Sequence, residues 1–161
     1  MGQNGITKFF GDWSVALDSP TCTIFSFLAG AQTMGEYTKE EFNKALRGIN
    51  AYDIKTLIAK KSWLEKQYIQ NHENFTKVYL FAFNNLAGTQ KFIPTEYAIM
   101  LMNVLLKKRY TLSEKFIKFL GEYTGKNEIF KDEWKMSLEF LNKTSADLSD
   151  YNENGRLFSK L

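Results

Sequence analysis

The spacing of apolar residues is the feature that most constrains how this chain can fold. These residues recur three and four positions apart along nearly the whole sequence, which is the period of an α-helix. Only two prolines and ten glycines interrupt the pattern, and both residue types mark helix ends and turns. The sequence therefore predicts an all-α fold.

Helix starts are indicated by residues that suit the first turn. Pro20 and Pro94 fit there because their absent N–H would have no partner. Thr38 and Glu41 have the spacing of a capping box, in which each side chain accepts the other residue's backbone N–H. Five predicted helices have definite ranges, which are 6–15, 53–69, 75–86, 94–106 and 131–141. Three more are predicted from their first residues: one is capped by Asp18 or Ser19, one opens at Thr38, and one is capped by Thr111 with Glu114. The loop after the helix capped by Asp18 or Ser19 is bounded by Gly30 and Gly35.

Burial is predicted from the faces of these helices. The apolar face of the first holds Ile6, Phe9, Phe10 and Trp13. In 53–69, the residues expected to point to a core are Ile54, Leu57, Ile58, Leu64 and Tyr68. The lysines expected to face water are Lys60, Lys61 and Lys66. Because 75–86 is almost continuously apolar, we expect it to be buried centrally.

Length and composition favour one soluble, globular domain over residues 1–161. A chain of this length suits a single core, and 44% hydrophobic content, with 16% aromatic residues, is enough to build one. The net charge of +3 is small and both signs are interspersed, so we expect neither nucleic acid nor a membrane as partner. Lys107, Lys108 and Arg109 end a predicted helix, where cations complement exposed carbonyls.

The sequence start and the single cysteine favour a reducing compartment, the cytosol or the nucleus. Cys22 has no partner for an internal disulfide, and the first residues lack a secretory signal. The longest apolar stretches run about ten residues, short of the roughly 20 that cross a bilayer. The chain begins abruptly within a helical pattern, so we expect upstream sequence to be missing.

One short pattern occurs three times: an apolar residue, three intervening positions, a glutamate and an aromatic residue. It covers Tyr37–Phe42, Phe92–Tyr97 and Ile129–Trp134. This is typical of the second half of an EF-hand, where the eighth loop residue pairs in a short strand and the twelfth is a glutamate. The sequence therefore predicts EF-hand-like helix–loop–helix units.

The same loops lack calcium ligands. Counting back from Glu41, positions one, three and five are Gly30, Gln32 and Met34. Counting back from Glu133, they are Glu122, Thr124 and Lys126. Calcium needs about six or more oxygen ligands, which lysine and methionine do not supply. We therefore expect no metal, and the loops are predicted to be scaffold.

Catalytic chemistry has little support in the sequence. A thiol nucleophile needs an activating base, and the single histidine, His72, lies in a polar stretch that we expect to be a solvated loop. One histidine and one cysteine cannot supply the four ligands of a structural zinc site. Cys22 is thus predicted to be a small apolar helix residue, and no cofactor is expected. An enzyme with an unrecognised site is a weaker alternative.

Acidic residues gather towards the end of the sequence and could receive a basic partner. From the residues alone, a solvated acidic face is the favoured interpretation. The residues are Asp132, Glu133, Glu139, Asp147, Asp150 and Glu153.

Five segments occur in a characteristic order: GAQTMGEYTKEEF (30–42), FTKVYLFAFNNLAGTQK (75–91), YAIMLMNVLLKKRY (97–110), IFKDEWKMSLEFL (129–141) and DLSDYNENG (147–155). Together they resemble the potentiating-neddylation (PONY) domain of the defective-in-cullin-neddylation family, and the resemblance runs from Gly5 to Leu161. The resemblance implies two calcium-free EF-hand-like helical subdomains packed into one compact domain.

The resemblance also implies a scaffold-type ligase accessory without catalytic residues. Its partners would be the N-terminally acetylated neddylation conjugating enzyme, the winged-helix domain of a cullin and, indirectly, the RING ligase subunit. It would act as a monomer in the nucleus and cytoplasm, and the rate gain would come from proximity and orientation. The alternative is an EF-hand-like interaction module, calcium-sensing or calcium-independent, unrelated to cullins.

By position, the resemblance implies a pocket for the acetylated methionine. Its lining would be Ile6, Cys22, Phe25, Ser26, Ala29, Ala31, Met34, Tyr37, Leu101 and Val104. Ordinary core packing is the other interpretation of these residues, and for Phe25 and Val104 both can hold. Gly35 stands where the family often has cysteine and Ala29 where it has phenylalanine, so we expect the depth and the peptide preference of this pocket to differ from those of common family members.

The cullin contact implied by the resemblance is an acidic residue, an alanine and a second acidic residue. Asp132 takes the first position, Arg156 stands at the alanine, and the second acid would lie beyond Leu161. Arginine against a basic cullin surface should repel. Three interpretations remain open. The affinity for a typical cullin is reduced, or the partner carries compensating acidic residues, or the last residues of the chain are displaced in register.

Overall fold

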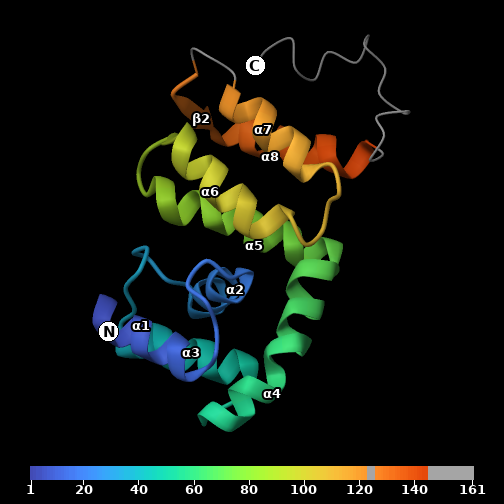
Figure 1. Ribbon diagram of the computed structural model, residues 1–161. Coiled ribbons are helices and arrows are strands. Elements are labelled where there is room, and N and C mark those ends of the chain that lie inside the picture. Colours follow the sequence, from blue (N-terminus) through green and yellow to red (C-terminus); the bar gives the residue numbers. More distant parts are fainter. Residues whose placement is uncertain (123–125, 145–161) are drawn as a thin grey trace. The chain divides into compact units, whose positions relative to one another are not determined.

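The computed structural model describes residues 1–122 and 126–144, which fold mostly as helices with two short strands (Figure 1). The elements are α1 (Gln3–Asp12), α2 (Pro20–Ala29), α3 (Lys39–Ile49), α4 (Ile54–Glu65), the π-helical turn η1 (Lys66–Gln70), α5 (His72–Ala87), β1 (Phe92–Pro94), α6 (Thr95–Leu106), α7 (Ser113–Glu122), β2 (Glu128–Phe130) and α8 (Lys131–Lys143). The predicted helical class is confirmed.

The chain divides into two compact units, Met1–Gly88 and Thr89–Leu161, called unit 1 and unit 2 below. Unit 1 contains α1 to α5, and unit 2 contains β1, α6, α7, β2 and α8. That residues 1–161 form one domain stays a prediction.

The core of unit 1 is an aromatic cluster centred on Phe25, which is fully buried. The rings nearest to it, with centroids 5.3–5.9 Å away, belong to Phe9, Phe10, Trp13, Tyr37 and Phe42. All five contacts are tilted or edge-to-face, the geometry that the aromatic quadrupole favours. The cluster joins α1, α2, the loop after α2 and α3.

Helix α1 differs from the predicted 6–15 because it ends at Asp12. Ser14 has a positive φ of 57°, and the Val15 N–H donates to the Phe10 carbonyl at 2.8 Å, which closes the helix end. The predicted apolar face is nonetheless buried at Ile6, Phe10 and Trp13, with Phe9 half-buried.

The caps of α2 and α3 match the sequence. Ser19, not Asp18, caps α2 by accepting the Thr21 N–H at 3.2 Å. Gly30 and Gly35 both have positive φ, 66° and 75°, a conformation that glycine adopts without strain. The capping box is confirmed, since Thr38 Oγ1 accepts the Glu41 N–H at 3.1 Å and Glu41 accepts the Thr38 N–H at 2.7 Å.

Helix α4 overturns several burial predictions. Leu57 and Leu64 are buried, but Ile54 is 36% and Ile58 is 47% exposed, because these isoleucines lie on a neighbouring face of the helix. Tyr68 in η1 is half-buried.

Two of the lysines expected to face water are half-buried and hydrogen-bonded. Lys60 Nζ donates to the Ile49 carbonyl at 2.8 Å, and Lys61 Nζ donates to the Ser14 carbonyl at 3.0 Å. Lys66 is exposed, as predicted.

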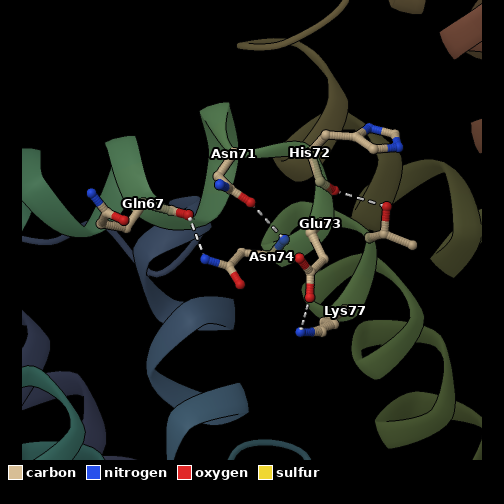
Figure 2. A network of polar contacts seen from close by, with 7 residues as sticks. Gln67, Asn71, His72, Glu73, Asn74 and Lys77 are labelled. Atoms are coloured by element: carbon tan, nitrogen blue, oxygen red, sulfur yellow. Dashed lines mark hydrogen bonds and ion pairs between the residues drawn. The ribbon is translucent and has the colours of Figure 1, made fainter.

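The α4 segment widens into η1 and stops at Asn71, which caps α5 (Figure 2). Asn71 accepts the Asn74 N–H at 3.0 Å, and the Asn74 side chain donates to the Gln67 carbonyl at 3.1 Å. His72 is the exposed first residue of α5, so the loop prediction was wrong. Helix α5 is buried on one side only, since Lys77 and Asn84 are exposed.

Unit 2 contains the strand pairing expected of EF-hands. Strands β1 and β2 are antiparallel, with Ile93 opposite Ile129, and both side chains are 1% exposed. Helix α6 begins after Pro94 and α8 begins at Lys131, as predicted, whereas α7 begins at Ser113, two residues beyond Thr111. Helices α6 and α7 pack side by side in this unit (Figure 1).

The strand register corrects the second repeat of the sequence pattern. Ile93, rather than Phe92, lies opposite Ile129, so counting from Ile93 places Tyr97 at position twelve and Glu96 one residue before it. The displacement is fixed by Thr95, whose N–H donates to the Asn127 carbonyl at 2.9 Å. Glu96 and Glu133 are therefore not equivalent.

Candidate peptide and cullin contact sites

Eight of the ten predicted pocket residues lie in unit 1, and α2 supplies four of them. Cys22, Phe25, Ser26 and Ala29 are spaced three and four residues apart, so they share one face of the helix. Tyr37, at the end of the next loop, reaches this face, and its ring lies 5.3 Å from that of Phe25.

A chain of hydroxyl groups crosses this face. Ser26 Oγ donates to the Cys22 carbonyl at 3.0 Å, so its oxygen accepts the proton of Tyr37 Oη at 2.6 Å. Burial raises the pKa of Tyr37, and the hydrogen bond with Ser26 partly opposes this shift. The predicted pocket wall is thus not purely apolar.

Cys22 lacks the properties of a nucleophile. Burial, with a smaller contribution from the Asp18 charge, raises the pKa of its thiol to about 12, while Lys61 acts in the opposite direction. The thiol donates to the Ala16 carbonyl at 3.3 Å. At neutral pH it is protonated, and the protonated thiol is a poor nucleophile.

The remaining unit 1 residues differ in accessibility. Ile6, Ala29 and Ala31 are buried, and the Ala31 carbonyl accepts the side-chain amide of Asn85 at 2.8 Å. Met34 is 47% exposed in the loop after α2. Phe25 belongs to the core cluster and is fully enclosed, so of these residues Met34 is the one that a peptide reaches without rearrangement.

Leu101 and Val104 lie on α6 in unit 2, three residues apart on one face. Leu101 is buried and Val104 is half-buried. The same face carries Tyr97 and Met100, which are 44% and 48% exposed and were not predicted. The spacing 97, 100, 101 and 104 follows the helical period and is the signal that would have found them. The pocket assignment as a whole stays a prediction.

The acidic residues of α8 do not behave alike. Asp132, the predicted cullin contact, is exposed in the first turn, and Glu139 is exposed further along. The Glu133 side chain is only 15% exposed and pairs with Lys126, so it is not part of an acidic face. Arg156, Asp147, Asp150 and Glu153 lie outside the described residues.

Residues 1–122 and 126–144 hold neither a candidate metal cluster nor a candidate membrane span. No three histidine, cysteine, aspartate or glutamate side chains come close enough together there to hold a metal ion. None of the helices in these ranges has the length and apolarity needed to span a bilayer.

The paired loops of unit 2 and the repeated helix–loop–helix pattern define an EF-hand-like helical protein. Sequence comparison narrows this class. The family described as cullin binding matches residues 56–156, and the chain belongs to that family.

Curated relatives cover nearly the whole chain at low identity. DCN1-like protein 4 of Drosophila melanogaster is 26% identical and DCN1-like protein 5 of Homo sapiens is 28% identical, each over 96% of this chain. DCN1-like protein 2 of Dictyostelium discoideum is 27% identical. The chain spans 62%, 65% and 58% of these three proteins, so each relative is considerably longer than the matched part.

Proposed function

We propose that this chain is a scaffold-type accessory of cullin neddylation that binds a cullin and the neddylation conjugating enzyme. The observation that carries the proposal is membership of the cullin-binding family over residues 56–156, which include the exposed Asp132 in the first turn of α8. The DCN1-like names of the curated relatives support the same role.

In the proposed mechanism, the adaptor orients the conjugating enzyme and the cullin and takes no part in the chemical step. Holding the conjugating enzyme and the cullin together makes transfer of the modifier effectively intramolecular, which raises the rate by proximity. The protonated thiol of Cys22 is consistent with an adaptor that has no nucleophile of its own. The RING ligase subunit enters indirectly, through the cullin. The chain acts as a monomer, in the nucleus and the cytoplasm.

The cullin contact is tested by calorimetry with a cullin winged-helix domain. Asp132→Lys reverses an exposed charge that would face a basic surface, so we expect affinity to fall about tenfold or more. The control is Glu96→Lys, because Glu96 is also the exposed second residue of a helix in unit 2. An equal loss of cullin affinity in both variants, or no loss in Asp132→Lys, would show that Asp132 is not a specific cullin contact.

The conjugating-enzyme contact is tested with a peptide from its N-terminus, with and without the acetyl group. The free ammonium is costly to bury in an apolar site, so we expect the acetylated peptide to bind about tenfold more tightly or better. Equal affinity of the two peptides contradicts the pocket assignment.

Met34→Asp locates that contact on the surface. Met34 is exposed, so its replacement should weaken peptide binding without lowering the melting temperature. Thr33→Asp, an exposed position of the same loop, is the matched control and should bind the peptide normally. Unchanged affinity in Met34→Asp places the peptide elsewhere.

A further inference from the structure

The loop before α8 holds a lysine at a position where a calcium-binding loop has a ligand. With Glu133 as position twelve, Lys126 is position five, and in an EF-hand both side chains bind the ion. Here Lys126 Nζ forms an ion pair with Glu133 Oε1, and the two side chains are only 17% and 15% exposed. The Lys126 ammonium therefore contacts the position-twelve carboxylate directly, as the calcium ion does in a calcium-binding loop.

Both residues of the pair are anchored by further hydrogen bonds. The second oxygen of Glu133 accepts the Phe130 N–H at 2.8 Å, at the junction of β2 and α8. The Lys126 carbonyl accepts the Thr95 hydroxyl at 2.9 Å, at the start of α6. The ion pair thus links Lys126 to the first turn of α8 at its junction with β2, and the Lys126 carbonyl adds a contact with the first turn of α6.

The charges match this replacement. A carboxylate removed from water needs a counter-charge, and one ammonium neutralises the single carboxylate of Glu133. A divalent ion would need several more oxygen ligands. We propose that the Lys126 ammonium is an internal replacement for the calcium ion of an EF-hand, so that Lys126 and the first turn of α8 are held together without a divalent ion.

Melting temperatures in EGTA and in millimolar calcium test the replacement. Lys126→Asp removes the ammonium and sets a second carboxylate beside Glu133, so we expect a fall of about 5 °C or more in EGTA. Calcium should restore part of that loss, because aspartate is a common ligand at position five. The unchanged protein should melt at the same temperature in both solutions.

Lys135→Asp is the matched control, since it makes the same charge change at an exposed position of α8. Its melting temperature should not respond to calcium. In Lys126→Asp the response should disappear when Glu133→Gln is added. A calcium response of the unchanged protein, or equal responses of Lys126→Asp and Lys135→Asp, would overturn the proposal.

A milder pair of variants keeps the test usable if Lys126→Asp does not fold. Lys126→Gln and Glu133→Gln should each lower the melting temperature, and the double variant should lose much less than the sum. Additive losses would show that the ammonium and the carboxylate do not depend on each other, which contradicts the proposal. Neither outcome depends on binding of a cullin or a conjugating enzyme.

Discussion

At the residue scale, Glu41 shows how a loop of this kind closes without an ion. One of its oxygens accepts the Thr38 N–H at 2.7 Å, and the other accepts the Gln32 N–H across the loop at 3.0 Å. The hydrogen bond from Thr38 is the main reason why the pKa of Glu41 is lowered. Glu133, at the corresponding position in the first turn of α8, instead forms an ion pair with Lys126. The two glutamates therefore differ in the partner of one oxygen, which is a backbone N–H across the loop at Glu41 and an ammonium group at Glu133.

Glu41 should make the protein sensitive to acid. Because its pKa is lower in the folded state, its charge stabilises the fold above the ordinary value of 4.5 and this contribution is lost as pH falls below it. We expect the free energy of unfolding to fall less steeply between pH 5 and about pH 3 in Glu41→Gln, measured by urea denaturation. Asn43→Ala, at an exposed position of the same helix without an ionisable group, should keep the slope of the unchanged protein. A slope unaffected by Glu41→Gln would contradict this role.

Cys22 should make the protein sensitive to alkali. Its pKa rises from 9.0 to about 12 on folding, so the unfolded state loses the proton first and stability declines as pH rises from 9 towards 12. One such group contributes a slope of at most about 1.4 kcal/mol per pH unit. Cys22→Ala should reduce the decline, measured by urea denaturation at pH 8 to 10.5. Ser62→Ala, at an exposed position that does not titrate in this range, is the control and should leave the decline intact.

At the element scale, the two adjacent lysines of α4 close the ends of two other helices. Lys60 binds the last carbonyl of α3, at Ile49, and Lys61 binds the Ser14 carbonyl just beyond α1. Cations at a helix C-terminus satisfy carbonyls that lack an intrahelical partner and complement the helix dipole. Helix α4 thereby contacts the ends of α1 and α3 through polar groups, while its Leu57 and Leu64 side chains are buried.

Lys60→Met is expected to lower the free energy of unfolding by about 1–2 kcal/mol, because it removes a charged, half-buried hydrogen bond and keeps the side-chain length. The Lys60 ammonium also lies 5.5 Å from the centre of the Trp63 ring, and the substitution removes this cation–π interaction as well. Urea denaturation measures the change. Lys66→Met, an exposed position of η1, should stay within about 0.5 kcal/mol of the unchanged protein. Equal effects at both positions would contradict the capping role.

At the scale of the whole molecule, two compact units share one chain. Unit 1 has a core around Phe25, and unit 2 has one that includes Ile93, Ile129 and Trp134. Chain length predicts a single cooperative domain, and the boundary at Gly88 makes that prediction testable.

Phe25→Ala should cost about 3–5 kcal/mol, because it leaves a cavity at the centre of the unit 1 cluster. If residues 1–161 form one domain, amides in both units should lose protection by the same amount, measured by hydrogen exchange. The exposed Met34→Ala is the control and should leave protection unchanged in both units. Loss of protection confined to residues 1–88 would show that the units unfold separately.

Most features that depend on neighbouring residues were predictable from the sequence. The helical class, a helix cap at Asp18 or Ser19, the Thr38–Glu41 capping box and the loop ends at Gly30 and Gly35 all depend on residues a few positions apart. The strand pairing of the EF-hand-like loops was predictable for a different reason, the repeated apolar, glutamate and aromatic pattern, because the paired residues lie far apart in the sequence. The exposed position of Asp132 follows from its place at a helix start. The family resemblance rested on the order of such segments, and the cullin-binding match confirms it.

Tertiary structure decided what depends on residues far apart in the chain. Ile54 and Ile58 are as apolar as Leu57, yet only packing against other helices selects which face of α4 is buried. The Thr95–Asn127 hydrogen bond set the strand register one residue away from the sequence pattern. The sequence predicts that Lys60 faces water, and for Lys126 it predicts only that a lysine at this loop position prevents calcium binding. Their partners, a distant carbonyl and a largely buried carboxylate, come into reach only when the chain folds.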